Sequence, residues 1–172
     1  MKKSIFCVFI LMVFHYSCIT DQNNYKETDI FEEYEAENGF TILHLPPVLF
    51  KIVLSVSDEK DYNSKELLDK VEVLKLMFFE ENENSLKVSD LKDSMNKKTT
   101  ELKYNLLTRI AEENNDISIY IIEQEKIIQE VLITIVSDEQ YIGVNLIGNL
   151  TKDDVMNVYK AINMQKIQEF EN

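Results

Sequence analysis

Apolar positions follow a helical period in the middle of the chain and a strand-like pattern in its last third. From Val88 onward, apolar residues recur at 88, 91, 95, 102, 106 and 110, which predicts one amphipathic helix or two shorter ones. Three runs rich in β-branched residues follow, at 117–122, 127–136 and 141–147. Because short polar turns separate these runs, consecutive antiparallel hairpins are favoured.

Two more strands and several helices are predicted before this region. Residues 40–45 form an apolar run that Pro46 and Pro47 end, because proline has no amide to donate to a strand ladder. Residues 73–79 are apolar on both faces apart from Lys75, a pattern typical of a central strand. Capping-type residues and prolines predict helix starts near Asp29, Pro47, Asn63 and Thr151.

The fold class expected from this order is α+β. Helices would pack against a mixed, mostly antiparallel sheet of about five strands, in the order α-β-α-α-β-α-β-β-β-α. Residues 31–168 would form this single domain, since the sequence contains neither an internal repeat nor an interdomain linker there.

The first seventeen residues have the composition of an export signal. Lys2 and Lys3 precede residues 5–14, which contain no charged side chain. Since a membrane-spanning helix needs about 20 apolar residues, this run is too short for a permanent anchor. Residues 1–17 are therefore predicted to be a cleaved signal peptide.

Cys18 is the predicted site of lipid attachment. Ser17 directly before Cys18 resembles the end of a bacterial lipobox, although His15 and Tyr16 depart from the strict pattern. Cleavage would leave Cys18 first, carrying palmitate or similar acyl chains, with residues 18–30 as a flexible tether. The alternative is a secreted protein without a lipid, in which Cys18 has no such role.

Charge restricts the partners of the mature chain. The formal net charge is −13, and loss of Lys2 and Lys3 with the signal makes the mature protein more acidic still. Nucleic acids are excluded as partners because their recognition needs a positive surface. Anionic lipids would repel the chain as a whole, so membrane contact is expected through the anchor.

Residues suited to catalysis are scarce. Cys7 and His15 would leave with the signal, so His44 is the one histidine of the mature chain. A nucleophile–histidine pair would have to use it, yet it lies at the end of an apolar strand beside Pro46. Neither a metal site nor a cofactor is predicted, since there is no cluster of thiols and imidazoles and no glycine-rich phosphate loop. We therefore expect a protein that is not an enzyme.

The ordered pattern resembles a known family of small lipoproteins. It is carried by the signal ending at Cys18, the strand-to-helix stretch 42–50, the run 73–79 and the segment 144–151. Together they resemble the Bacteroidota lipoprotein family labelled domain of unknown function 4252, over most of residues 31–162. The resemblance implies an envelope lipoprotein and supplies no catalytic residues. Asp93-Ser94-Met95 also resembles an O-glycosylation acceptor in such proteins, which makes Ser94 a candidate modification site.

Three functions follow as hypotheses. The first is a non-enzymatic interaction or regulatory module, anchored by lipid to the inner or outer membrane of the cell envelope and facing the periplasm or the exterior. The alternative is a carrier of a small apolar ligand, with a pocket between sheet and helices. A hydrolase comes third, because thirty-one acidic residues offer many carboxylate pairs without a defined geometry.

Overall fold

The computed structural model describes residues 25–49, 66–67, 69–82, 86–111 and 115–157. The predicted signal peptide, Cys18 and the first part of the predicted tether lie outside these ranges. So do most of the predicted helix after Pro47 and the start of the predicted helix at Asn63. In the described part, residues 47–49, 66–67, 69–70 and 152–157 are helical.

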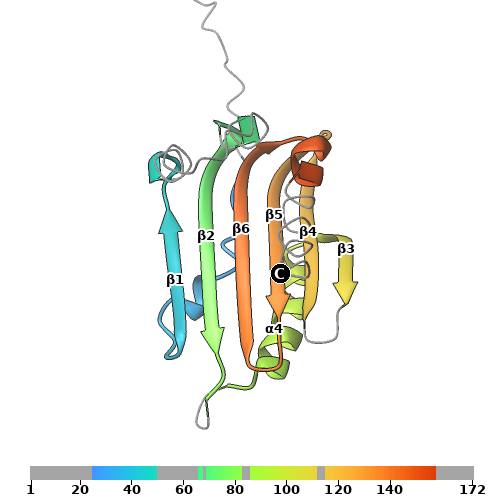
Figure 1. The fold of residues 1–172 in the computed structure, drawn as a ribbon. Helices are drawn as coiled ribbons and strands as arrows, with labels where there is room; N and C mark the ends of the chain where they lie inside the picture. Colours follow the sequence, from blue (N-terminus) through green and yellow to red (C-terminus); the bar gives the residue numbers. More distant parts are fainter. Residues whose placement is uncertain (1–24, 50–65, 68, 83–85, 112–114, 158–172) are drawn as a thin grey trace, which may run out of the picture.

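Six strands form one antiparallel sheet in the order β1-β2-β6-β5-β4-β3 (Figure 1). All five neighbouring pairs are antiparallel. Our prediction of a mixed sheet is therefore wrong, and the sheet is antiparallel throughout. The strands are β1 (Phe40–Leu45), β2 (Val71–Glu80), β3 (Asn105–Ala111), β4 (Asp116–Gln124), β5 (Ile127–Val136) and β6 (Gln140–Leu150).

The predicted strand positions are confirmed in five cases. β1 and β5 have the predicted bounds, while β2, β4 and β6 extend a few residues beyond the predicted runs. β2 begins at Val71, two residues before the predicted run. A two-residue turn, Glu125–Lys126, joins β4 to β5, and both residues have positive φ. This backbone matches the twist of the two strands it connects.

β3 is the strand that we did not predict. The sheet therefore has six strands, where we predicted about five. The predicted helical stripe continued through Leu106 and Ile110, but the helix that begins at Val88 ends at Glu101. Lys103 then has a φ of +63°, a left-handed backbone that stops the helix. Residues 105–111 pair with β4 instead.

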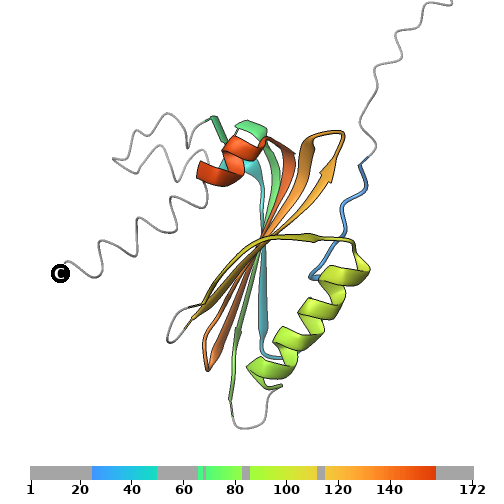
Figure 2. The same ribbon diagram turned by 90° about the vertical axis from the view of Figure 1, so that its right-hand side faces the viewer.

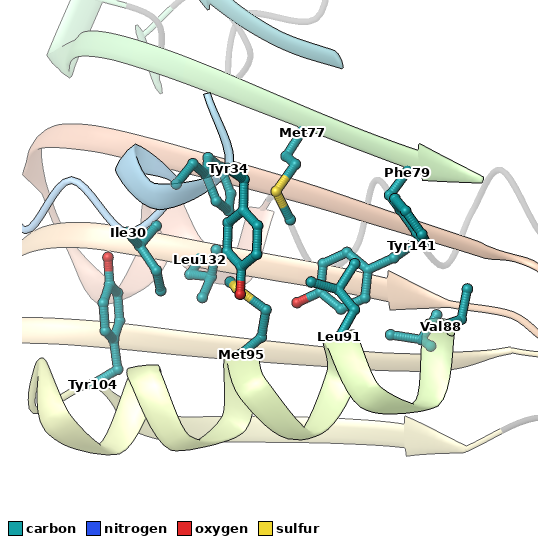
Figure 3. Packing of buried hydrophobic residues seen from close by; sticks show 12 residues of the cluster. Ile30, Tyr34, Met77, Phe79, Val88, Leu91, Met95, Tyr104, Leu132 and Tyr141 are labelled. Atoms are coloured by element: carbon teal, nitrogen blue, oxygen red, sulfur yellow. The ribbon is translucent and has the colours of Figure 1, made fainter. Parts of the chain in front are cut away.

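One face of the sheet, here called the helix face, is covered by α4 (Val88–Glu101), as Figure 2 shows. The short 3₁₀ helix η2 (Glu32–Tyr34) lies on the same face, since Tyr34 packs in the same buried cluster as α4. Leu91 and Met95 point from α4 toward the sheet (Figure 3). The buried cluster between these layers comprises Ile30, Phe31, Tyr34, Met77, Phe79, Val88, Leu91, Met95, Tyr104, Leu132, Val136 and Tyr141.

The opposite face carries a second buried cluster, which contains many β-branched side chains. It comprises Val71, Ile117, Ile119, Ile121, Ile128, Val131, Ile133, Leu150 and Val155. Val155 comes from the helical residues 152–157, whose start has the predicted cap. The Asp154 carboxylate accepts hydrogen bonds from the backbone amide and hydroxyl of Thr151, at 2.7 and 2.6 Å, and the Thr151 hydroxyl accepts one from the Asp154 amide.

Strand register defines two ends of the sheet. Leu45 pairs near the start of β2, Ile128 pairs with Leu150, and Gln124 pairs with Ile127. The starts of β2, β3 and β5 and the ends of β1, β4 and β6 therefore lie at one end, which we call the upper end, as drawn in Figure 1. The loops at the lower end include residues 81–82 and 137–139, where the Glu81 amide donates to the Glu139 carbonyl at 2.8 Å.

Candidate functional site

The chain enters the domain as an extended segment on the helix face. Residues 25–31, here called the N-terminal strap, run beside the end of α4 (Figure 2). Ile30 and Phe31 are fully buried. We predicted residues 18–30 as a flexible tether separate from the domain, and this prediction is wrong for 25–30, because these residues make hydrogen bonds, ion pairs and core contacts with the sheet.

A buried carboxylate on β5 binds the strap. Glu130 is 0% exposed. Its Oε1 atom accepts hydrogen bonds from the Tyr25 hydroxyl and the Thr28 backbone amide, each at 2.7 Å. Its Oε2 atom accepts from the Thr28 hydroxyl at 2.9 Å, from the Tyr104 hydroxyl and from the Asn145 amide at 3.3 Å. These five donors compensate the loss of water around the carboxylate. We call this set the Glu130 cluster.

The two tyrosines of the Glu130 cluster act as donors. Burial raises the pKa of the Tyr25 and Tyr104 hydroxyls far above the ordinary value, and the nearby negative charge of Glu130 raises both further. Both hydroxyls therefore keep their protons at neutral pH. Neither provides the phenolate that a tyrosine nucleophile or general base would require.

A buried lysine on β2 holds the strap from the neighbouring part of the helix face. Lys75 is 2% exposed, and its amine lies 2.9 Å from Asp29 Oδ1 and 3.3 Å from Glu27 Oε1. Burial lowers the pKa of the Lys75 amine, but the hydrogen bonds and charges of Asp29 and Glu27 outweigh burial and raise it. The amine therefore stays protonated at neutral pH and is not available as a nucleophile.

A cavity of about 500 Å³ lies at the upper end, on the opposite face of the sheet. It is formed by the start of β3, the end of β4, the start of β5 and the helical residues 152–157. Its apolar lining comprises Leu106, Leu107, Ile121, Ile128, Val155 and Met156. Glu123 and Lys152 also line it, and their charged groups are 3.3 Å apart. A mostly apolar cavity with a few polar groups suits a small apolar ligand.

The candidate residues from the sequence lie apart from these features. Ser94 is exposed on α4, and its hydroxyl lies 3.1 Å from that of Tyr34. His44 is exposed on β1 and pairs with Glu35 at 2.9 Å. Glu81 accepts a hydrogen bond from the Val88 amide at 2.8 Å, which satisfies a free donor at the start of α4. Within the described ranges, no three carboxylates, histidines or cysteines are grouped as metal ligands would be.

Sequence reasoning did not single out Lys75 or Glu130 as functional positions. Lys75 interrupts the otherwise apolar run 73–79, and Glu130 is the one charged residue of the mostly apolar run 127–136. A charged side chain at an inward position of a buried strand requires a partner. That signal was present, but the sequence does not reveal that the partners lie in the strap, about one hundred residues before Glu130.

Comparison with known proteins assigns the chain to a family. A family model described as domain of unknown function (DUF4252) matches residues 34–158, and the chain belongs to this family. The resemblance inferred from the sequence is thereby confirmed. No curated protein and no solved structure matches. None of the helices in the described ranges combines the length and apolar character that a membrane-spanning segment needs.

Proposed function

We propose that this member of the DUF4252 family is a lipid-anchored protein of the bacterial cell envelope that works as a non-enzymatic interaction module. The observation that carries the proposal is the N-terminal strap. The chain goes from Tyr25 directly into buried contacts with Glu130, so a lipid on Cys18 would be connected to the folded domain through residues 19–24 alone. Such a lipid would hold the sheet within the reach of these six residues.

The buried polar groups support a structural role for the cluster. Glu130 is sealed from water by the strap, and the Tyr25, Tyr104 and Lys75 side chains keep their protons. Such an arrangement fixes the segment that leads to the proposed anchor. General acid–base or nucleophilic catalysis needs a group that changes protonation in contact with substrate.

Metabolic labelling with a clickable palmitate analogue tests the anchor. The wild-type protein should incorporate the label, and Cys18→Ala should not. Cys7→Ala is the matched control. Because Cys7 lies within the predicted signal, this substitution should leave labelling unchanged. Absence of label in wild-type protein from its own host would overturn the anchor.

Crosslinking in intact cells tests the interaction module. A photo-crosslinker at the exposed residue Gln140 should recover a specific envelope protein with the wild-type chain. The same crosslinker at exposed Gln124, at the other end of the sheet, compares the two ends. Failure to recover a specific partner at either position under several growth conditions would contradict an interaction role.

A carrier of a small apolar ligand is the second candidate, and the upper cavity favours it. Its volume of about 500 Å³ lies in the range of roughly 300–1,000 Å³ that ligand pockets occupy. Native mass spectrometry of protein from its own host should then reveal a bound apolar molecule. Leu107→Asp should remove the added mass, whereas Leu86→Asp, an exposed position outside the cavity, should retain it. A clean unliganded mass for the wild type would exclude the carrier.

A further inference from the structure

The upper cavity lies beside an edge of the sheet. Among the strands of the described residues, β3 is the last in the sheet order (Figure 1), and β4 is its only neighbour. Residues 105–108, at the start of β3, line one side of the cavity, and Val155 and Met156 line it from the helical residues after β6. Ile121 and Ile128 line it from β4 and β5. Apolar side chains from four elements thus meet in one cavity next to an edge strand.

The free side of β3 is open to a further strand. Within the described ranges, no backbone hydrogen bond joins residues 105–111 to any element other than β4. Prolines and lysines often block edge strands, and β3 contains neither. Its one charged side chain, Arg109, is bound to Asp116 of β4. A bulge between Leu106 and Thr108 leaves Leu107 51% exposed at the cavity, and bulges of this kind re-aim side chains beside binding sites.

The other edge of the sheet is less suited to strand addition. β1 is followed directly by Pro46 and Pro47, which have no amide to donate to a neighbouring strand. None of the residues 40–45 lines the cavity. The unpaired backbone and the apolar cavity therefore coincide at β3.

Charge restricts what can occupy this surface. Glu123 and Lys152 are the charged residues of the cavity lining, and they form an ion pair at 3.3 Å. The Lys152 side chain is 73% exposed, whereas that of Glu123 is 28% exposed. Because exposed ion pairs are weak, a cationic side chain of a partner can replace Lys152 at the Glu123 carboxylate. The net charge of −13 favours a positively charged partner over an acidic one, a second copy of this chain included.

We propose that an extended segment of a partner protein adds to the sheet as a strand along β3. Its main chain pairs with the free side of β3, one apolar side chain enters the upper cavity, and a neighbouring lysine or arginine binds Glu123. Strand addition takes its affinity from main-chain hydrogen bonds and its selectivity from side-chain pockets. The proposal rests on the interaction module proposed above and names the surface that this module uses. The cavity then holds part of a partner instead of a free apolar molecule.

Selection from a displayed library of random dodecapeptides tests this surface. The target is the full, lipid-modified protein in phospholipid nanodiscs. Peptides that bind should alternate apolar and polar residues and carry a lysine or arginine next to an apolar one. Leu107→Asp places a charge in the cavity and should weaken binding of a selected peptide by about tenfold or more. Leu86→Asp, an exposed position outside the cavity, is the matched control and should leave binding unchanged. A library that yields the same peptides on wild type and on Leu107→Asp would overturn the proposal.

The main-chain contacts are tested on a selected peptide. Amide nitrogens at alternate residues of a strand point to opposite sides, so methylation of one alternate set removes the donors that face β3 and methylation of the other set does not. One pattern should abolish binding and the other should retain it, whereas equal binding of both would overturn strand addition. Hydrogen exchange should slow at residues 105–111 when the peptide binds. Slowing at residues 40–45 instead would assign the peptide to β1 and overturn the proposal.

Two other occupants of this surface would also overturn the proposal. One is a second copy of the chain, revealed by a dimer in sedimentation whose formation slows exchange at residues 105–111. The other is a small apolar molecule that native mass spectrometry shows to remain bound when the peptide is added. If either is found while the crosslinker at Gln140 or Gln124 still recovers a partner in cells, the β3 surface is wrong and the interaction module stands. Failure to recover a partner at both positions would overturn the proposed function instead.

Discussion

Thr28 binds Glu130 twice, through its backbone amide to Oε1 at 2.7 Å and through its hydroxyl to Oε2 at 2.9 Å, across 102 positions of sequence. A single strap residue thereby contacts both oxygens of a carboxylate that is 0% exposed. The strap closes the helix face over β5, and the buried charge is retained because the strap supplies donors for it.

Glu130→Gln should therefore destabilise the fold and loosen the strap. The amide replaces one acceptor oxygen with a donor that faces other donors, so at least two hydrogen bonds to the charged group are lost. The expected decrease in the free energy of unfolding is about 2–4 kcal/mol, measured by urea denaturation. Tryptic cleavage after Lys26 in the strap should also become faster.

The matched control is Glu125→Gln on the same hairpin. Glu125 is exposed in the β4–β5 turn, so its substitution should change stability by less than about 0.5 kcal/mol. If both variants unfold at the wild-type urea concentration and are cleaved after Lys26 at the wild-type rate, the Glu130 cluster does not hold the strap.

A double-mutant cycle between Lys75 and Asp29 measures the second attachment of the strap. Lys75→Met removes a buried charge, and Asp29→Asn keeps a residue type that tolerates the positive φ of 48° at this position. Because the amine and carboxylate are 2.9 Å apart, the two substitutions should not be additive. We expect a coupling energy of about 1–3 kcal/mol. Additive effects in urea denaturation would mean that the ion pair contributes no net stability.

Phe31 and Gly143 provide a test of packing under the strap. A Cβ atom at 143 would lie 2.7 Å from Cζ of the fully buried Phe31 ring. Gly143→Ala should therefore lower the free energy of unfolding by about 1–3 kcal/mol through overpacking. Adding Phe31→Leu makes room for the methyl group, so the double variant should be more stable than the sum of the single effects predicts.

Gly148→Ala is the control for that rescue. A Cβ at 148 would lie 2.1 Å from the backbone carbonyl oxygen of Lys70, which a smaller side chain at 31 cannot move. Phe31→Leu should therefore not relieve Gly148→Ala. If Phe31→Leu reduced the loss of stability equally for Gly143→Ala and Gly148→Ala, its effect would not depend on the contact between residues 31 and 143.

The sequence predicted strands where local and tertiary preferences agree. The β-branched runs that became β4 and β5 are buried at successive positions on both faces of the sheet, and their turns are short and polar. β3 was missed because Leu102, Leu106 and Ile110 also fit a helical stripe. Pairing with β4 outweighed the weak helical preference of residues 105–111, so tertiary context decided the outcome.

The candidate site was harder to predict because it joins segments far apart in the chain. The strap looked like a tether, since Tyr25 and Ile30 are isolated apolar residues in a polar stretch. Contacts with Glu130 and Lys75 hold the strap in place, and the strap in turn supplies the partners that these two buried charges need. A local pattern contains the charged residues in apolar strands, but it does not reveal the distant segment that supplies their partners.

Asp116 at the lower end should make stability depend on pH in the acid range. Arg109 donates a hydrogen bond to Asp116 Oδ1 at 2.8 Å and Lys92 donates to Oδ2 at 2.6 Å. The hydrogen bond from Arg109 is the main cause that lowers the Asp116 pKa from 3.8 to about 2, with Lys92 adding to it against the effect of burial.

A lowered pKa in the folded state means that the ionised form stabilises the fold above the unfolded pKa, and that this stability is lost as the pH falls from about 4 through about 2. Asp116→Asn should therefore have a lower free energy of unfolding than the wild type at pH 7. Between pH 4 and pH 2, the free energy of unfolding should fall less for this variant than for the wild type. Urea denaturation at a series of pH values measures the difference, with Asp138→Asn in the β5–β6 turn as the control. A parallel loss in wild type and Asp116→Asn would contradict the role of the Arg109–Asp116–Lys92 contact.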